Sequence, residues 1–187
     1  MVDLSVDLGG LKMRTPVATA SGTFGYGSEY VGALDYAKLG AVTAKFRKRY
    51  PDVRIRVSVP EDLLFVPMDA VLISQVLSNL LENAVVHGGG HTTEIRLSVR
   101  REGPEAVFAV EDNGDGIEQK VLPHLFDGTL AAAAGDTENG GKRNMGLGLS
   151  VCQAIIHAHS GSIEAHNLME GAEFVFRLPL EQEEEKA

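Results

Sequence analysis

Four polar side chains recur at every fourth position of one segment, and their types suit a metal–phosphate group. They are Gln75, Asn79, Asn83 and His87. On a helix, residues four apart lie one above another, so the four would form a single column. An asparagine oxygen can join a Mg2+ shell that waters and phosphate oxygens complete, without adding negative charge that would repel a nucleotide. A hydrated polar stripe explains the same column, and taken alone the spacing favours that plainer interpretation.

A second candidate is the tight turn DNGDG, which follows a predicted strand and runs from Asp112 to Gly116. Gly114 and Gly116 let the backbone approach a flat ligand closely. Asp112, at the end of the strand, can accept a hydrogen bond from an exocyclic amine such as that of adenine. The alternative is a simple Asp-Gly turn. A calcium loop is excluded, because the two glycines occupy expected ligand positions and Pro123 stands where the bidentate glutamate should be.

Two further glycines, Gly146 and Gly148, open a predicted helix near residues 147–159. The N-terminus of a helix offers backbone N–H groups and the positive end of its dipole, which favour phosphate. A P-loop is excluded because no Gly-Lys-Ser or Gly-Lys-Thr follows. The dinucleotide fingerprint fails because Val151 replaces its third glycine. Cys152, the single cysteine, lies on the predicted apolar face and is most simply part of the core.

The stretch between the second and third motifs, residues 127–143, is rich in glycine, alanine and polar residues and lacks periodicity. A long irregular loop in a compact domain is typically a lid or disordered. Lys142 and Arg143, directly before the glycine motif, can reach nucleotide phosphates as a lid closes. They can equally be solvated loop charges, and the sequence leaves both interpretations open.

These candidate residues need a sheet and at least two helices to bring them together. Asp69 suits the N-cap of a helix over 69–87, and the glycines at 88–90 end it. We expect an α+β fold, a two-layer α/β sandwich whose mixed, largely antiparallel sheet is covered on one face by helices near 69–87 and 147–159. The strands are expected near residues 52–58, 93–101, 105–112, 161–166 and 172–180.

Five short boxes follow one another in order: NLLENAVVH at 79–87, DNGDG at 112–116, a reduced LF at 125–126, GLGLS at 146–150 and GAEFVFRLPL at 171–180. In this order they resemble the Bergerat ATP-binding fold of sensor histidine kinases, over about residues 46–180. The surrounding sequence looks closest to the potassium-responsive, Kdp-type sensor kinases. The resemblance implies the catalytic ATP-binding domain of a two-component sensor, which binds Mg-ATP and transfers its γ-phosphate to a histidine.

The resemblance also assigns roles to the candidate residues. Asn83 would be a Mg2+ ligand, and Asn79 would lie beside it near the phosphates, both as catalytic residues. Asp112 would bind the adenine N6 amine, between glycines that border the base, while Gly146 and Gly148 would face the phosphates beneath the lid. Related hydrolysing ATPases carry a glutamate general base at the position of Asn79, a role that an amide cannot fill, so we expect slow hydrolysis.

Three departures from the family pattern bear on phosphate transfer. Many members have a lysine at the position of Val86, so phosphate contact is expected to shift to His87, Lys142 or Arg143. The LF box normally has a second aromatic residue, but residues 127–129 are Asp-Gly-Thr. None of the six histidines has the sequence context of a phosphoacceptor helix. The implied partners are therefore a separate phosphoacceptor histidine domain and a response regulator.

Two other functions remain open on this fold: an anti-sigma-type protein serine kinase and a non-catalytic nucleotide-binding scaffold. The fragment is expected to be cytoplasmic, because its single cysteine fits a reducing compartment and no run approaches the ~20 apolar residues of a membrane span. The parent protein is expected in the inner membrane. The acidic balance argues against general nucleic-acid binding. Residues 46–58 are locally basic, which fits a solvated strand face or a docking patch for an acidic partner.

Residues 1–45 differ from the rest of the 187-residue chain, because they are neutral while the whole formal charge of -9 belongs to residues 46–187. A helix near 30–39 and a strand near 41–44 are predicted, as in a βαβ-like appendage. The stretch ATASGTFGYG at 18–27 resembles the start of class 1 dihydroorotate dehydrogenases, which are FMN-dependent barrel enzymes. A complete barrel needs about 250 residues. We therefore expect a truncated, inactive segment joined as a fusion or chimera to an ATPase-like domain at 46–180, with a disordered acidic tail at 181–187.

Overall fold

The computed structural model describes residues 6–8, 11–13, 31–33, 36–62, 64–127 and 143–181. Its main feature is a five-stranded sheet with the strand order β4-β6-β7-β9-β8. β4 pairs with β6 in parallel, and the other neighbours are antiparallel. The strands are β4 (Arg54–Ser58), β6 (Glu94–Glu102), β7 (Glu105–Asp112), β8 (Ser162–Asn167) and β9 (Ala172–Pro179). All five lie within two residues of their predicted positions.

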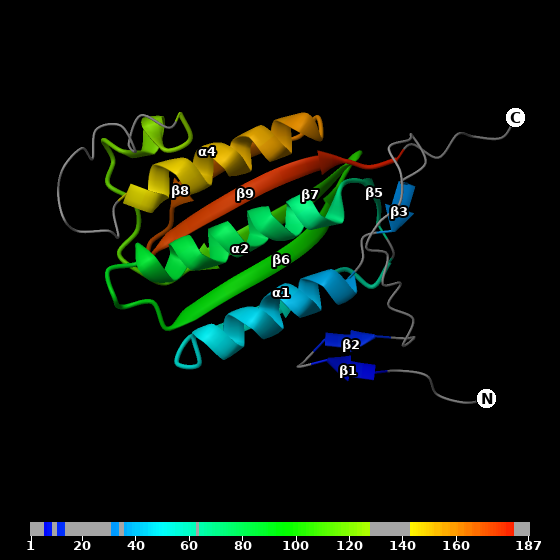
Figure 1. Cartoon of the computed structure of the whole chain (residues 1–187), viewed down its shortest axis with the longest axis horizontal. Helices are drawn as coiled ribbons and strands as arrows, with labels where there is room; N and C mark the ends of the chain where they lie inside the picture. The colour runs from blue at the N-terminus through cyan, green and yellow to red at the C-terminus, as the bar shows by residue number, and fades with distance from the viewer. Residues whose placement is uncertain are drawn as a thin grey trace, which may run out of the picture.

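Three helices lie side by side on one face of this sheet (Figure 1). They are α1 (Tyr36–Arg49), α2 (Ala70–Val86) and α4 (Arg143–Ala158). The expected α+β sandwich, with a mixed sheet and its helices on one face, is confirmed. In the described part of the chain, every helix is too short or too polar to cross a membrane.

α2 forms because its start is capped and its apolar residues repeat with the helical period. As predicted, Asp69 is the N-cap: its carboxylate accepts hydrogen bonds from the backbone N–H groups of Val71 at 2.8 Å and Leu72 at 3.1 Å. The helix ends at the C-cap His87. Its buried face consists of Ile73, Val76, Leu77, Leu80, Leu81 and Ala84. This face packs on the sheet and leaves the polar column on another side.

The segment before residue 50 folds differently from its prediction. The expected helix near 30–39 and strand near 41–44 are wrong, because α1 runs without a break from residue 36 to residue 49. Its buried positions recur at the spacing of one helical face: Leu39, Val42, Thr43 and Phe46. Burial of this stripe outweighs the low helix propensity of Gly40. α1 spans the expected domain boundary after residue 45, and that boundary stays a prediction.

Short elements lie outside the main sheet. β1 (Val6–Leu8) pairs with β2 (Leu11–Met13), and β3 (Val31–Ala33) pairs with β5 (Phe65–Pro67). Both pairs are antiparallel, unlike the parallel pair of a βαβ unit. A 3-10 helix, η1 (Leu122–His124), follows β7. The expected acidic tail lies outside the described residues, except for Glu181, whose backbone N–H donates to the carbonyl of Phe65 at 3.0 Å.

The main core lies between the sheet and the helices. Alternate residues of β7 face the helices, and Phe108 stacks on Phe176 of β9 with ring centroids 4.5 Å apart. The opposite face of the sheet carries only a small buried cluster of Val107, Ala109 and Val175. The helix-covered face therefore supplies most of the apolar burial that holds the site residues in place.

The basic residues of 46–58 are largely engaged within the chain. Arg47 donates to a backbone carbonyl of β4, Arg49 pairs with a glutamate of α2, and Arg56 pairs with Glu94 at 3.0 Å. These internal contacts favour the solvated strand face over a docking patch for an acidic partner.

Candidate functional site

α2 and α4 run antiparallel, and two contacts set their register. Nε2 of His159, just past the end of α4, accepts a hydrogen bond from the backbone N–H of Asp69 at 2.9 Å. Further along, the side-chain nitrogen of Asn79 donates to Sγ of Cys152 at 3.6 Å. In this register Asn83, one turn on, lies opposite the glycine-containing start of α4. The amide column and the glycine motif therefore meet at one end of the sandwich, on the left in Figure 1.

Asn83 carries the clearest sign that a ligand completes the site. Its Nδ2 atom is buried and has no hydrogen-bond partner among the described residues. A buried polar group without a partner costs about 1–3 kcal/mol. Across from it, Gly148 borders open space, since an added Cβ would meet no described heavy atom within 4 Å. A ligand that brings an acceptor oxygen, such as one of a phosphate, can approach here and receive the hydrogen bond that the described chain does not.

The glycine motif is not placed as predicted. α4 begins at Arg143, so Gly146 and Gly148 are its fourth and sixth residues and do not open it. Only the first four N–H groups of a helix lack an internal partner. Gly148 therefore leaves room by its missing side chain and offers no free N–H. Lys142, the side chain of Arg143 and the surroundings of Gly146 lie outside what the structure describes, and their phosphate contacts stay predictions.

Asp112 ends β7 as a carboxylate that is only 7% exposed. Its Oδ1 atom accepts hydrogen bonds from the backbone N–H groups of Gly114 at 2.8 Å and Ala172 at 3.4 Å. Oδ2 makes no hydrogen bond within the described residues. Burial raises the pKa of Asp112, and the two backbone hydrogen bonds partly offset that shift. The side chain is thus fixed through one oxygen, and the other is available to a donor such as an amine.

The glycines of the turn after β7 are required by close packing. An added Cβ at Gly114 would lie 2.6 Å from Cα of Gly88 and 2.8 Å from Oγ1 of Thr92. Gly116 has φ of +76°, a left-handed conformation that favours glycine. The turn therefore packs directly against the loop that follows α2. This contact brings Asp112 and the polar column of α2 to the same end of the sheet.

His87 lies one turn beyond Asn83, as the C-cap of α2. Its backbone N–H donates to the carbonyl of Asn83 at 2.9 Å. Burial lowers the pKa of His87. The imidazole is therefore neutral near neutral pH, and it can offer a phosphate an N–H donor but no fixed positive charge.

The reduced LF box packs on the sheet. Leu125 is 1% exposed, and the ring of Phe126 meets that of Phe174 edge-on at 6.5 Å. These contacts fasten the chain after η1 to β9. The predicted effect of residues 127–129 on a lid lies mostly outside the described residues.

Sequence reasoning missed the residues that hold these groups in place. Thr92 is buried, and its hydroxyl donates to a carbonyl in the last turn of α2 at 2.8 Å. Cys152 is core, as predicted, but it also contacts Asn79, and burial raises the pKa of its thiol to about 11. Asn113 and Asn167 bind backbone groups on either side of the turn. The one available signal was the asparagine at each strand end, a residue typical of turns.

A sheet covered by helices on one face, with its polar site between two antiparallel helices and a strand-end turn, is the architecture of a Bergerat-type ATP-binding domain. Residues 68–182 match the family described as Histidine kinase-, DNA gyrase B-, and HSP90-like ATPase. The chain belongs to this family.

Two curated relatives are sensor proteins. The sensor protein KdpD of Clostridium acetobutylicum is 40% identical over 136 residues, 72% of this chain and 15% of that protein. The sensor protein KdpD of Escherichia coli is 38% identical over 129 residues, 69% of this chain and 14% of that protein. These relatives support the predicted likeness to the ATP-binding domain of Kdp-type sensor histidine kinases. The chain spans about a seventh of their length.

Solved structures agree in fold. The nucleotide-free catalytic domain of histidine kinase ThkA has a TM-score of 0.64 at 24% identity, covering 78% of this chain and 91% of that chain. Full-length ShkA in complex with AMPPNP has a TM-score of 0.66 at 22% identity, covering 82% of this chain and 32% of that one. ThkA in complex with the response regulator protein TrrA has a TM-score of 0.58 at 24% identity, covering 78% of this chain and 40% of that one.

Proposed function

We propose that this domain binds Mg-ATP and presents its γ-phosphoryl group to a histidine on a phosphoacceptor domain of a two-component sensor kinase. The observation that carries the proposal is the buried, unpaired amide nitrogen of Asn83, at the same end of the sheet as Asp112. ATP is a ligand that uses both: it has an exocyclic amine at one end and a metal–phosphate group at the other. Membership of the ATPase family supports ATP as the ligand.

The part of the site around Asp112, which we call the base end, would recognise adenine. Oδ2 of Asp112 would accept a hydrogen bond from the N6 amine, while Oδ1 stays bonded to the backbone N–H of Gly114. We assign Gly114 and Gly116 to the border of the flat base, where the close packing that excludes a Cβ at either position would hold the backbone of the turn. A base with a carbonyl in place of the amine would face the Asp112 carboxylate with two acceptors and bind poorly.

The part of the site around Asn83, which we call the phosphate end, fits a Mg2+ ion that is bound together with ATP. The oxygen of the Asn83 amide would be its protein ligand, with phosphate oxygens and waters as the others. When bound, Mg2+ would neutralise charge on the phosphates and polarise the γ-phosphorus. Asn79, held by Cys152, would contact the phosphates or their waters. We assign further phosphate contacts to the residues around them: His87, Lys142, Arg143, Gly146 and Gly148.

Transfer of the γ-phosphoryl group requires this domain to orient the nucleotide more than to accept or donate protons. An unprotonated imidazole nitrogen of the acceptor histidine attacks the γ-phosphorus, the bond from phosphorus to the bridging oxygen breaks, and ADP leaves. The chain's part is to hold the γ-phosphoryl group in line for that attack. Asn79 cannot accept a proton from water as a carboxylate can, so hydrolysis stays slow.

The finer partners belong to the same proposal. A histidine-bearing phosphoacceptor domain would receive the phosphoryl group and a response regulator would take it on, as the solved complex of ThkA with TrrA suggests by likeness. The proposal extends to the parent protein, which would be anchored in the inner membrane with this domain on its cytoplasmic side.

The experiment supplies the chain with radiolabelled Mg-ATP and a separately purified phosphoacceptor domain from a Kdp-type relative. We expect an acid-labile, alkali-stable label on that domain, as for phosphohistidine, and none with Asn83→Ala. An acid-stable label on a serine-bearing partner would instead identify an anti-sigma-type serine kinase. Nucleotide binding without transfer to either protein would mean a non-catalytic scaffold and would overturn the proposed transfer.

A further inference from the structure

We propose that Asn113 and Asn167 are positioning residues for adenine recognition. Their side-chain amides clamp the two ends of the turn at 113–117, and so hold Asp112 and the two turn glycines where a base can meet them. This inference rests on the proposed nucleotide site. Neither asparagine has a direct contact with a nucleotide in the proposal, so both act through the turn.

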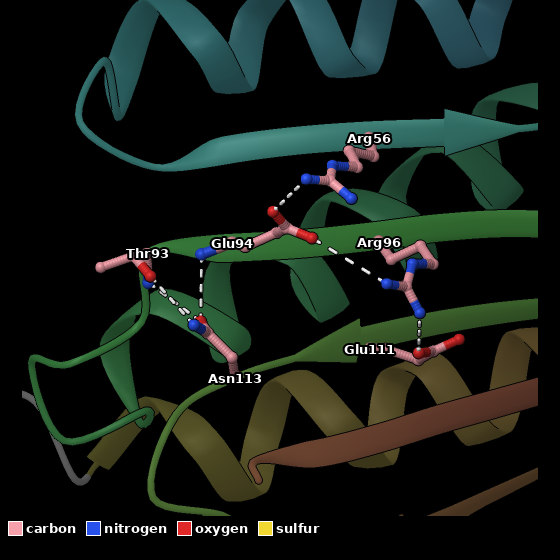
Figure 2. A network of polar contacts seen from close by, with 6 residues as sticks. All are labelled: Arg56, Thr93, Glu94, Arg96, Glu111 and Asn113. Atoms are coloured by element: carbon pink, nitrogen blue, oxygen red, sulfur yellow. Dashed lines mark hydrogen bonds and ion pairs between the residues drawn. The ribbon is translucent and has the colours of Figure 1, made fainter.

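Asn113 ties the start of the turn to the start of β6. Its Oδ1 accepts hydrogen bonds from the backbone N–H groups of Thr93 and Glu94, both at 3.0 Å, and its Nδ2 donates to the hydroxyl of Thr93 at 2.9 Å. Figure 2 shows the amide reaching across to these two residues. Three hydrogen bonds from one exposed side chain fix the residue that directly follows Asp112.

The strand that receives Asn113 is itself anchored. The carboxylate of Glu94 pairs with Arg56 of β4 at 3.0 Å and lies 3.9 Å from Arg96, which pairs with Glu111 of β7 at 3.0 Å (Figure 2). These ion pairs are partly exposed, and each contributes little to stability alone. Together they connect three neighbouring strands at the edge where the turn is attached, so Asn113 binds to a supported part of the sheet.

Asn167 ties the far end of the turn to the end of β8. Its Oδ1 accepts a hydrogen bond from the backbone N–H of Ile117, and its Nδ2 donates to the carbonyl of the same residue, both at 2.7 Å. An added Cβ at Gly116 would lie 2.9 Å from Oδ1 of Asn167, so the turn packs closely on this amide. One side chain thus satisfies both polar groups of Ile117, as a neighbouring strand would.

The two clamps bracket the part of the turn that would border the base. Between them, the only hydrogen bond from Asp112 into the turn is the one to the N–H of Gly114. Two glycines in so short a turn would leave it with many accessible conformations if the clamps were absent. Ordering these residues before binding removes an entropic cost from nucleotide affinity.

The test compares the full chain with Asn113→Ala and Asn167→Ala, and measures affinity for ADP and for inosine diphosphate by calorimetry with Mg2+. Inosine diphosphate has the same charge but lacks the exocyclic amine. We expect each variant to bind ADP about tenfold more weakly, as for the loss of one to two net hydrogen bonds. Binding of inosine diphosphate should weaken less, so the preference for ADP falls. Glu170→Ala, on the exposed turn after β8, is the matched control and should change neither affinity.

Aspartate variants give a sharper outcome. Asn113→Asp keeps oxygens for the two backbone N–H groups, and the Thr93 hydroxyl can turn to donate to it, so adenine preference should be largely retained. Asn167→Asp sets a carboxylate oxygen against the carbonyl of Ile117, so preference should be lost. The proposed role of Asn113 and Asn167 would be overturned if the two aspartate variants had the same preference for ADP. It would also be overturned if both alanine variants kept the preference of the unmodified chain. Absence of ADP binding by the unmodified, folded chain would overturn the proposed function instead.

Discussion

The two ends of the proposed nucleotide site differ in how far the chain satisfies its own polar groups. At the base end, Asp112, Asn113 and Asn167 hydrogen-bond the turn to the starts of β6 and β9 and the end of β8. At the phosphate end, Asn83 keeps a buried nitrogen without a partner among the described residues, and an added Cβ at Gly148 would meet no described heavy atom within 4 Å. The base end is built in advance, while the phosphate end is completed by the ligand.

Base specificity and phosphate-binding energy therefore arise at different ends of the site. A preorganised base end loses little entropy on binding and can reject a base with the wrong edge. The unpaired amide nitrogen of Asn83 at the phosphate end costs free energy that an acceptor oxygen of the ligand would relieve. Substitutions at the two ends should therefore affect unliganded stability and nucleotide affinity in different proportions.

The largest effect is expected from Asp112→Asn. The loss of a hydrogen bond to a charged acceptor, about 1.5–3 kcal/mol, should weaken ADP binding about a hundredfold. The melting temperature without ligand should change little, because the asparagine oxygen can still accept from the backbone N–H groups of Gly114 and Ala172. Calorimetry and thermal unfolding measure the two effects. Asp115→Asn, exposed in the same turn, is the control, and equal losses in binding and melting would mean that Asp112 is structural.

Asn83→Ala should weaken Mg-dependent ADP binding by about ten- to thirtyfold, as for a lost contact of about 2 kcal/mol. The free energy of unfolding without ligand should change by less than about 1 kcal/mol, because the substitution breaks no hydrogen bond of Nδ2. Gln75→Ala, exposed at the other end of the same column, should change neither quantity. A large loss of unliganded stability would show that the amide already has a partner.

The pH dependence of ADP binding should follow Asp112. Burial raises its pKa, and the N6 amine is bound by the ionised form, so affinity is full above the raised pKa and is lost as pH falls through it. We expect the affinity to fall as the pH is lowered from neutral through the raised pKa of Asp112, beyond the change that nucleotide titration itself produces. The Asp112→Asn variant lacks this ionisable group, so its pH profile measures the change that nucleotide titration alone produces. Parallel pH profiles for the two proteins would contradict the assignment.

Gly148→Ala should raise the free energy of unfolding without ligand and lower the affinity for ADP. An alanine inside α4 should raise the free energy of unfolding by about 0.5–1 kcal/mol, since its Cβ meets no described atom within 4 Å. The same methyl group should weaken ADP binding with Mg2+ a few fold by intruding on the phosphate end. Chemical denaturation and calorimetry would measure both, and a gain in stability with unchanged affinity would place the phosphates elsewhere.

The sequence predicted those parts of the fold that local patterns determine. The five strands of the sheet and α2 follow from their periodicity and from the Asp69 cap. The single helix α1 could not be predicted from local patterns, because Gly40 has a low helix propensity and the burial of the stripe on either side of it depends on the packing of the whole domain. The start of α4 was placed late because the preceding residues carry no periodic signal.

The site was predictable only as far as spacing could show it. The four-residue repeat predicted that Asn79 and Asn83 share one face of a helix, but not that a nitrogen of Asn83 would be buried without a partner. The two asparagine clamps could not be predicted from the sequence. Asn113 binds Thr93 across twenty positions of the chain, and Asn167 binds Ile117 across fifty. Such contacts depend on which strand ends become neighbours, and that is decided by the sheet.

The role of Asn83 can be tested by nuclear magnetic resonance of the asparagine side-chain amides, with Mn2+ in place of Mg2+. Mn2+ broadens signals of nuclei close to it. With ADP and substoichiometric Mn2+, we predict that the Asn83 amide signal broadens first, while those of Asn113 and Asn167 persist. Mn2+ without nucleotide should leave all three unchanged. An Asn83 signal that persists with bound Mn-ADP would contradict the assignment of this side chain to the metal–phosphate site.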